Sequence, residues 1–353
     1  MKSYLTEIFK EKGIEFFQTD RLSLDNYYYE PFQDSKEIFD ENKIFETESG
    51  KIQELQPYYP SIFAFFLDGS RKPYKIGDMI TTDNKFAPVV AGQIGAACCK
   101  RTNGKVELFK LLKRNVLMVF DSINNDDFED IKRKLTKLRN CEIEVDKYVF
   151  DKMRDDAPTN AAVARIQKRM QDLEIDLLTD MANNGDLATD KMLVIDGSLQ
   201  FLTQKFDPRI FYNVIGISKS FNPNLTGLLR GKKHIGVLLA KLKFGERTPV
   251  YRYETANNRY IIGAWYLRIR KPGKVRNALD GVIKVEKMAM QEEQENGFDS
   301  SMIDNISSSI LGEIYPTCHG NDLRWNNHLY PIYLTEKVLK SKFFSDVHFM
   351  NIF

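Results

Sequence analysis

The sequence has few cysteines, and none of them is paired at the spacing of a metal or disulfide motif. No CxxC pair occurs among the four cysteines, which are Cys98, Cys99, Cys141 and Cys318. A zinc ribbon and a disulfide framework both depend on such pairs, so neither is expected to organise this chain. Cys318, His319 and His328 offer too few ligands for a zinc site, and local packing explains them better. We therefore expect reduced thiols in a cytoplasmic protein.

Long hydrophobic runs are also absent. The longest apolar stretches, such as Ser61 to Leu67 and Ile235 to Ala240, are far shorter than the roughly 20 residues that a membrane-spanning helix needs. The first 17 residues, MKSYLTEIFKEKGIEFF, mix charges among their apolar positions and do not resemble a secretory signal. These patterns predict a protein without a membrane segment.

Neither sign of charge dominates. The chain has 51 Lys and Arg residues against 49 Asp and Glu residues, a formal net charge of +2. Net charge therefore does not indicate a nucleic-acid partner, and any such interaction must depend on the local distribution of charge. No repeat of 20 to 50 residues is visible, which disfavours a solenoid or a propeller.

What the sequence does contain is an alternation of strand-like and helix-like segments. It predicts strands over 61–67, 87–100, 105–120, 191–195, 214–218, 235–242 and 260–270, with the turn at 102–104 making a hairpin. It predicts helices over 3–12, 126–138, 146–153, 160–181, 278–294, 303–314 and 335–344. This order indicates an α/β fold, a mixed sheet flanked by helices. Residues 1–57 look like an N-terminal extension, either a loose partner-binding arm or a surface-packed segment, and 58–353 form the main domain.

Two aspartates follow two of these apolar strands directly. Asp68 begins an Asp-Gly-Ser turn after the strand at 61–67, and Asp196 begins another after the strand at 191–195. An unpaired carboxylate is costly inside a strand, so each is expected at the strand's carboxyl end, where a cation or ligand can bind. A single Asp-Gly-Ser sequence is usually only a turn, but two after buried strands are more informative.

Glu174 and Lys219 complete the candidate set. Glu174 lies on the edge of the apolar face of the helix at 160–181, and Lys219 directly follows the strand at 214–218. Three carboxylates can converge as oxygen ligands for Mg²⁺ or Mn²⁺, and metal ions held in this way activate water against a phosphodiester. A solvated helix-surface glutamate is the alternative, because Asp172 and Asp176 are its equally charged neighbours.

Basic and aromatic residues interleave in the second half of the chain. A basic loop covers 230–234, and a longer stretch combines Arg252, Arg259, Arg268, Arg270, Lys271, Lys274 and Arg276 with Tyr251, Tyr253, Tyr260, Trp265 and Tyr266. Guanidinium groups can bind phosphates while aromatic faces stack on unpaired bases. The alternative is a solvated basic face over core aromatics.

Taken together, several segments resemble the NurA family of nucleases. The resemblance is carried between about residues 60 and 340 by the order of Asp68-Gly-Ser-Arg71, Arg165 with Glu174, Ile195-Asp-Gly-Ser-Leu199, Ile215-Gly-Ile-Ser-Lys219, Trp265-Tyr-Leu-Arg-Ile269 and Leu329-Tyr-Pro-Ile-Tyr-Leu-Thr-Glu336.

This resemblance implies an RNase H-like fold, a homodimer, and Mn²⁺- or Mg²⁺-dependent cleavage of DNA by 5′-to-3′ exonuclease and single-strand endonuclease action. It also implies partnership with a HerA-type hexameric ATPase, in DNA end processing or in defence against phage. The metal ligands would be Asp68, Glu174 and Asp196, with Lys219 assisting catalysis. Many family members have a His or Asp soon after the late Tyr-Pro segment. Here Glu336, Lys337 and Val338 follow that segment instead, and we expect Glu336 as the fourth ligand, with Asp346 and His348 as alternatives.

Two other functions remain open from the sequence. The first is a catalytically inactive DNA-binding or scaffold subunit of an ATPase complex. The second is an RNase H-like enzyme that acts on RNA, although the chain lacks room for the additional domains of a guide-dependent enzyme.

Overall fold

A long antiparallel meander forms the centre of the protein in the computed structural model. The structure describes residues 4–24, 38–48, 51–138, 141–152, 155, 157–187, 191–199, 207–221, 228–229, 233–254, 260–272, 278–318 and 325–353. The meander consists of β4 (Phe63–Ile80), β5 (Phe86–Thr102) and β6 (Lys105–Phe120). Asn103 and Gly104 adopt φ angles of 52° and 79° between β5 and β6, as a tight hairpin turn requires. The predicted hairpin is confirmed.

Parallel strands extend the meander on both sides. After α2 (Asn125–Leu135) and the short β7 (Lys137–Leu138), β8 (Cys141–Tyr148) lies parallel to β6. The long helix α3 (Pro158–Asn183) then leads to β9 (Met192–Asp196), which lies parallel to β4, and β10 (Val214–Ser218) lies parallel to β9. The central order is therefore β6-β5-β4-β9-β10.

Antiparallel strands continue the sheet beyond β10. The order there is β10, β16 (Val282–Met288), β15 (Ile262–Arg268), β14 (Tyr251–Glu254) and β2 (Ile38–Ile44). Within the described residues this makes one mixed sheet of 14 strands, which includes the short β3 (Gln53–Glu54) and β13 (Glu246–Arg247). A separate small ribbon joins β11 (Leu228–Leu229) to β12 (Lys233–His234). The remaining helical segments are η2 (Pro208–Phe211), α4 (Ile235–Lys241), α5 (Gln291–Asn296), α6 (Ser300–Gly312), η4 (Trp325–Asn327), α7 (Tyr330–Ser341) and α8 (Asp346–Met350).

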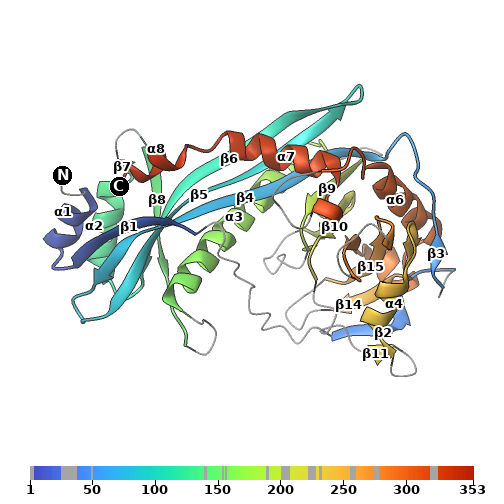
Figure 1. Ribbon diagram of the computed structural model, residues 1–353, viewed down its shortest axis with the longest axis horizontal. Coiled ribbons are helices and arrows are strands. Elements are labelled where there is room, and N and C mark those ends of the chain that lie inside the picture. Colours follow the sequence, from blue (N-terminus) through green and yellow to red (C-terminus); the bar gives the residue numbers. More distant parts are fainter. Residues whose placement is uncertain are drawn as a thin grey trace.

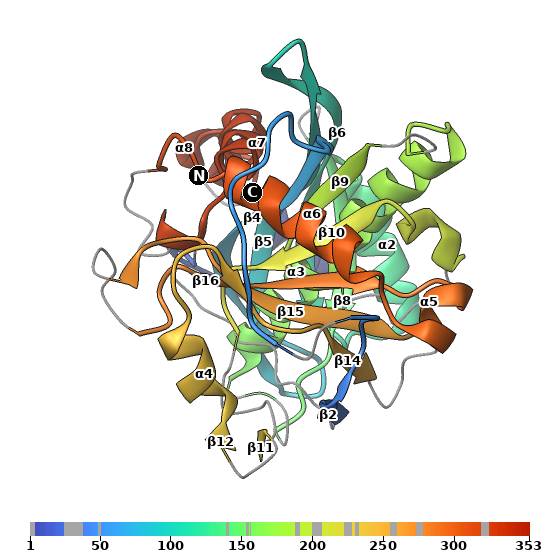
Figure 2. The ribbon, with the colours of Figure 1, turned by 90° about the vertical axis from the view of Figure 1, so that its right-hand side faces the viewer.

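Helices cover both faces of the sheet (Figure 1). On one face, α3 contributes Ile166, Leu173 and Leu177 to a core shared with β4, β5 and β9. On the other face, α6 packs Ile303, Ile306 and Ile310 against β9, β10, β15 and β16, and α7 lies beside it, as Figure 2 also shows. The predicted architecture of a mixed sheet flanked by helices is confirmed at this level. No helix among the described residues is long and apolar enough to cross a membrane.

The described part of the N-terminal segment contributes β1, β2 and β3 to this sheet. β1 (Glu15–Ser23) pairs with the second half of β4, and α1 (Tyr4–Glu11) packs with the C-terminal residues Phe349, Ile352 and Phe353. The expectation of a loose arm is wrong for these residues, because their apolar side chains complete a core. A partner-binding role for residues 1–57 stays a prediction.

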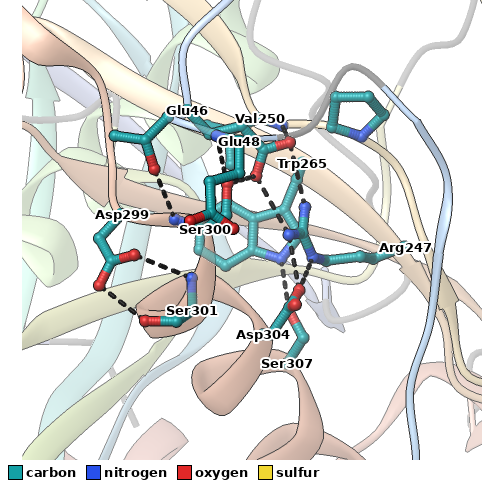
Figure 3. A network of polar contacts seen from close by, with 12 residues as sticks. Glu46, Glu48, Arg247, Val250, Trp265, Asp299, Ser300, Ser301, Asp304 and Ser307 are labelled. Atoms are coloured by element: carbon teal, nitrogen blue, oxygen red, sulfur yellow. Dashed lines mark hydrogen bonds and ion pairs between the residues drawn. The ribbon is translucent and has the colours of Figure 1, made fainter.

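A buried ionic network fixes the chain around Glu46 (Figure 3). Arg247 is fully buried, with its Nη2 atom 3.1 Å from Glu46 Oε2 and its Nε atom donating to Asp304 Oδ1 at 2.6 Å. Ser300 donates to the same glutamate at 3.3 Å. Burial raises the pKa of Glu46, and the charge of Arg247 opposes that rise. The network therefore ties the segment before β3 to both β13 and α6.

Three segments differ in type from their sequence-based prediction. Residues 146–153 were expected to be helical, yet 146–148 complete β8, whose burial alternates in the manner of a strand. Residues 235–242, expected as a strand, form α4 with Ile235 and Leu239 buried one turn apart. Residues 278–294, whose charged residues have helix-like spacing, were expected to be helical, but they contain β16. This strand is buried on both faces, and its Lys284 and Lys287 form ion pairs. A short apolar run does not distinguish helix from strand without its partners.

Candidate active site

Asp68 does not end its strand. β4 runs through Asp68, Gly69 and Ser70 as far as Ile80, because β5 continues to pair with it along this length. The predicted chain turn at Asp68 is therefore wrong. On the other edge of β4, however, the pairing with β9 stops before Asp68, because its last residue pair is Leu67 and Ile195. Asp68 thus lies where β4 separates from β9.

Asp68, Asp196 and Lys219 project from the same face of the sheet. The core beneath α6 contains Phe66, Val194 and Ile217. Two positions after these residues come Asp68, Asp196 and Lys219, in the same order. Side chains two residues apart in a strand share a face, so the three groups lie on the side of α6 and α7. Asp196 is the last residue of β9, as predicted.

Glu174 approaches from the opposite face at the same point. It lies on α3 with only 5% of its surface exposed, so the solvated alternative is wrong. A side chain at residue 69 would collide with it, since a Cβ atom there would lie 2.7 Å from Glu174 Cδ. The N–H group of Gly69 hydrogen-bonds to the Glu174 carboxylate. Because Gly69 has no side chain, the Glu174 carboxylate can reach the point where β4 and β9 separate, which we call the fork.

Lys219 forms an ion pair with Asp196 in the fork. Its Nζ atom is 2.6 Å from Asp196 Oδ2 and 3.0 Å from Nδ1 of His328, a buried residue. Asn327 donates to the Lys219 carbonyl at 2.8 Å. His328 and Asn327 therefore belong to the site, although no spacing in the sequence connects them with Lys219.

Of the three residues weighed as a fourth ligand, Glu336 is one whose charge acts on Asp68. Its charge raises the pKa of Asp68, and it lies on α7 over the same face of the sheet. Asp346 instead pairs with Lys72 and accepts a hydrogen bond from Tyr74 at 2.9 Å. His348 stacks on Phe344.

Burial and mutual repulsion dominate the electrostatics. Burial raises the pKa of Asp68 well above its usual value, and Asp196 adds to this shift while Lys219 opposes it. Burial, together with the charge of Asp196, raises the pKa of Glu174 to about 8. The charges of Glu174, Asp196 and Glu336 thus all act on Asp68, and repulsion between carboxylates opposes the ionisation of Asp68 and Glu174.

A divalent cation fits the chemistry of this group. Carboxylate oxygens are the ligands that Mg²⁺ and Mn²⁺ prefer, and a cation would relieve the repulsion that raises these pKa values. Among the described residues, however, no three His, Cys, Asp or Glu side chains are already arranged as a metal-binding group. The ammonium of Lys219 supplies the positive charge beside Asp196 in this conformation.

The loop after Asp196 is held by Glu286, a fully buried residue of β16. Its Oε2 atom accepts hydrogen bonds from the Ser198 hydroxyl and the Leu199 N–H, both at 2.7 Å. Its Oε1 atom lies 2.7 Å from Lys284 Nζ. Glu286 therefore fixes the direction in which the chain leaves Asp196, a role that the sequence did not reveal.

Much of the predicted basic and aromatic surface is core. Residues 251, 253, 265, 266 and 268 are at most 3% exposed, and the guanidinium of Arg268 donates to the backbone carbonyls of Leu239, Ala240, Ala278 and Asp280. For these residues the DNA-contact interpretation is wrong and the packing alternative holds. Arg230, Arg259, Lys274 and Arg276 lie outside the described residues.

No protein-family model matches the chain, and no curated protein matches it either. Among solved structures, the chain is similar to the NurA nuclease from Sulfolobus solfataricus, with 14% sequence identity and a TM-score of 0.47 over 85% of this chain and 84% of that chain. The case for a function therefore depends on the site itself.

Proposed function

We propose that the protein is a metal-dependent deoxyribonuclease that hydrolyses phosphodiester bonds. The observation that carries this proposal is the convergence of Asp68, Glu174 and Asp196 at the fork between β4 and β9, with Lys219 beside them. Buried carboxylates whose pKa values are raised by burial and by each other's charge are a feature of functional sites. An acidic cluster that holds cations beside a lysine suits an anionic substrate.

Each group of residues in the site would have its own role in hydrolysis. Asp68, Glu174, Asp196 and Glu336 would hold Mn²⁺ or Mg²⁺, which lowers the pKa of bound water and stabilises a departing oxygen. Lys219, whose ammonium lies 2.6 Å from Asp196 Oδ2, would contact the scissile phosphate. His328 and Asn327 keep the lysine side chain and backbone in place.

Finer assignments follow the sequence resemblance and are part of the proposal. They are an RNase H-like fold, with which the order β6-β5-β4-β9-β10 is compatible, and 5′-to-3′ exonuclease with single-strand endonuclease action. They also include a homodimer and a HerA-type ATPase partner in cytoplasmic DNA end processing or phage defence.

Cleavage of labelled DNA in the presence of Mn²⁺ tests the proposal. We expect Asp68→Asn, Asp196→Asn and Glu174→Gln each to lower the rate by about 100-fold or more, because each removes a charged ligand. Asp176→Asn is the matched control, since Asp176 is exposed on the same helix two residues beyond Glu174. Undiminished cutting by the Asp196 variant would refute the mechanism.

A DNA-binding scaffold subunit is the second candidate. The observation that favours it is the ion pair between Lys219 and Asp196, in which an ammonium supplies the positive charge beside the carboxylate. Metal-independent DNA binding with no cleavage, even with the ATPase added, would support this function. Matched DNA and RNA substrates in the same assay separate a deoxyribonuclease from an enzyme that acts on RNA.

A further inference from the structure

Three tyrosines are exposed around the C-terminal end of α6. Tyr58, Tyr59 and Tyr315 have 49%, 64% and 60% of their surface exposed. Tyr58 and Tyr59 are fixed to the helix, since the Tyr58 N–H donates to Ser308 and the Tyr59 hydroxyl donates to the Gly312 carbonyl at 3.1 Å. Tyr315 follows Gly312 by three residues. Single exposed apolar side chains are ordinary, but three large rings gathered at one helix end indicate a binding surface.

Tyr315 is supported from behind by a buried cation. The guanidinium of Arg270 lies 5.4 Å from the centre of the Tyr315 ring, and Arg270 itself is only 8% exposed. Arg270 donates to the carbonyls of Ile314 at 2.9 Å and Asn326 at 3.3 Å. These bonds fix the guanidinium, so one side of the ring rests against it while most of the ring remains open.

This arrangement is continuous with the candidate active site. Asn326, which accepts from Arg270, is followed by Asn327 and His328, the two residues that contact Lys219. The charge of Lys219 also reaches Cys318, three residues beyond Tyr315. The exposed ring is therefore attached through a short, buried set of contacts to the lysine proposed to bind the scissile phosphate.

We infer that Tyr315, together with Tyr58 and Tyr59, forms a stacking surface for the unpaired bases of single-stranded DNA entering the site. This inference rests on the proposed function and adds a preference for the form of substrate. Aromatic faces stack on bases of any sequence, but the bases of a duplex are already stacked on one another. The surface therefore favours a single strand or a frayed end over an intact blunt duplex.

Fluorescence anisotropy with a short labelled oligothymidylate and with a blunt duplex, both in chelator, tests the inference without cleavage. Stacking contributes about 1–3 kcal/mol per base, so Tyr315→Ala should raise the Kd for the single strand by about 5- to 150-fold. The Kd for the duplex should change by less than about twofold. Tyr315→Phe keeps the ring and should retain single-strand binding.

Tyr4→Ala is the control for loss of an exposed tyrosine, because Tyr4 is 41% exposed on α1, whose buried residues belong to a different core cluster from those of α6. It should leave both Kd values unchanged. An unaltered single-strand Kd in Tyr315→Ala, or equal weakening of strand and duplex, would overturn the stacking surface. Cleavage is measured separately with Mn²⁺: parent protein that binds the strand with this discrimination but never cuts it would refute the nuclease proposal and leave the surface standing.

Discussion

The carboxylate of Glu174 occupies the space into which a side chain at residue 69 would point. A Cβ atom there would lie 2.7 Å from Glu174 Cδ and 3.0 Å from its Cγ atom. The atoms that would have to move belong to the end of a side chain and not to the backbone. An alanine at this position should therefore displace the carboxylate while β4 keeps its place.

Gly69→Ala is expected to reduce cleavage by about 10- to 100-fold while lowering the free energy of unfolding by less than about 2 kcal/mol, since a side-chain shift costs less than a rearranged core. Rates and urea unfolding of the single variants and the double variant with Glu174→Ala measure this effect. If the change acts through Glu174, the double variant cuts no more slowly than Glu174→Ala alone. Strictly multiplicative losses would contradict the relationship.

The stability of the metal-free protein should depend on pH through Glu174. Burial and Asp196 raise its pKa from 4.5 to about 8, so between these values the folded state binds more protons than the unfolded state. The free energy of unfolding therefore falls as pH rises through this window, by at most about 1.4 kcal/mol per pH unit for one group. Urea unfolding in chelator between pH 5 and 9 measures this slope.

Two further unfolding experiments test whether ionisation of Glu174 causes this pH dependence. Glu174→Gln should flatten the slope, because the group no longer ionises. Added Mn²⁺ should stabilise the parent protein most at high pH, where the carboxylates are charged. Stability that rises between pH 5 and 8 in chelator would contradict the electrostatic description of the site.

Removing Glu286 should loosen the chain beyond Asp196. Glu286→Ala leaves the buried ammonium of Lys284 without its ion pair and the Leu199 N–H without its acceptor, so we expect a loss of about 3–5 kcal/mol in the free energy of unfolding. Ser198→Ala removes one hydrogen bond and should cost about 1 kcal/mol. If urea unfolding shows that Glu286→Ala and Ser198→Ala lower the free energy of unfolding equally, Glu286 does not anchor this loop.

Arg247 should matter for stability more than for catalysis. Arg247→Met leaves Glu46 buried without its main counter-charge, which is expected to lower the free energy of unfolding by about 3–5 kcal/mol (Figure 3). Adding Glu46→Gln should recover part of the loss, because a neutral amide is easier to bury. Thermal and urea unfolding of both variants test this expectation, and a double variant less stable than the single one would contradict it.

The local pattern of the sequence determined the elements that have a long or distinctive repeat. The periodicity of 160–181 and the turn at Asn103 and Gly104 predicted α3 and the β5–β6 hairpin, because both depend on contacts between near neighbours in the chain. The apolar segments before Asp68 and Asp196 predicted strands because both runs are short and rich in strand-forming residues.

Tertiary structure decided what the local pattern left open. Residues 235–242 and 278–294 take their type from the partners that cover them, and β4 continues past Asp68 because β5 pairs with it there. The approach of Glu174 to Gly69, and of His328 to Lys219 across 109 positions, follows from how α3 and the segment before α7 pack on the sheet. Such contacts join distant parts of the chain, so their residues cannot be identified from spacing along it.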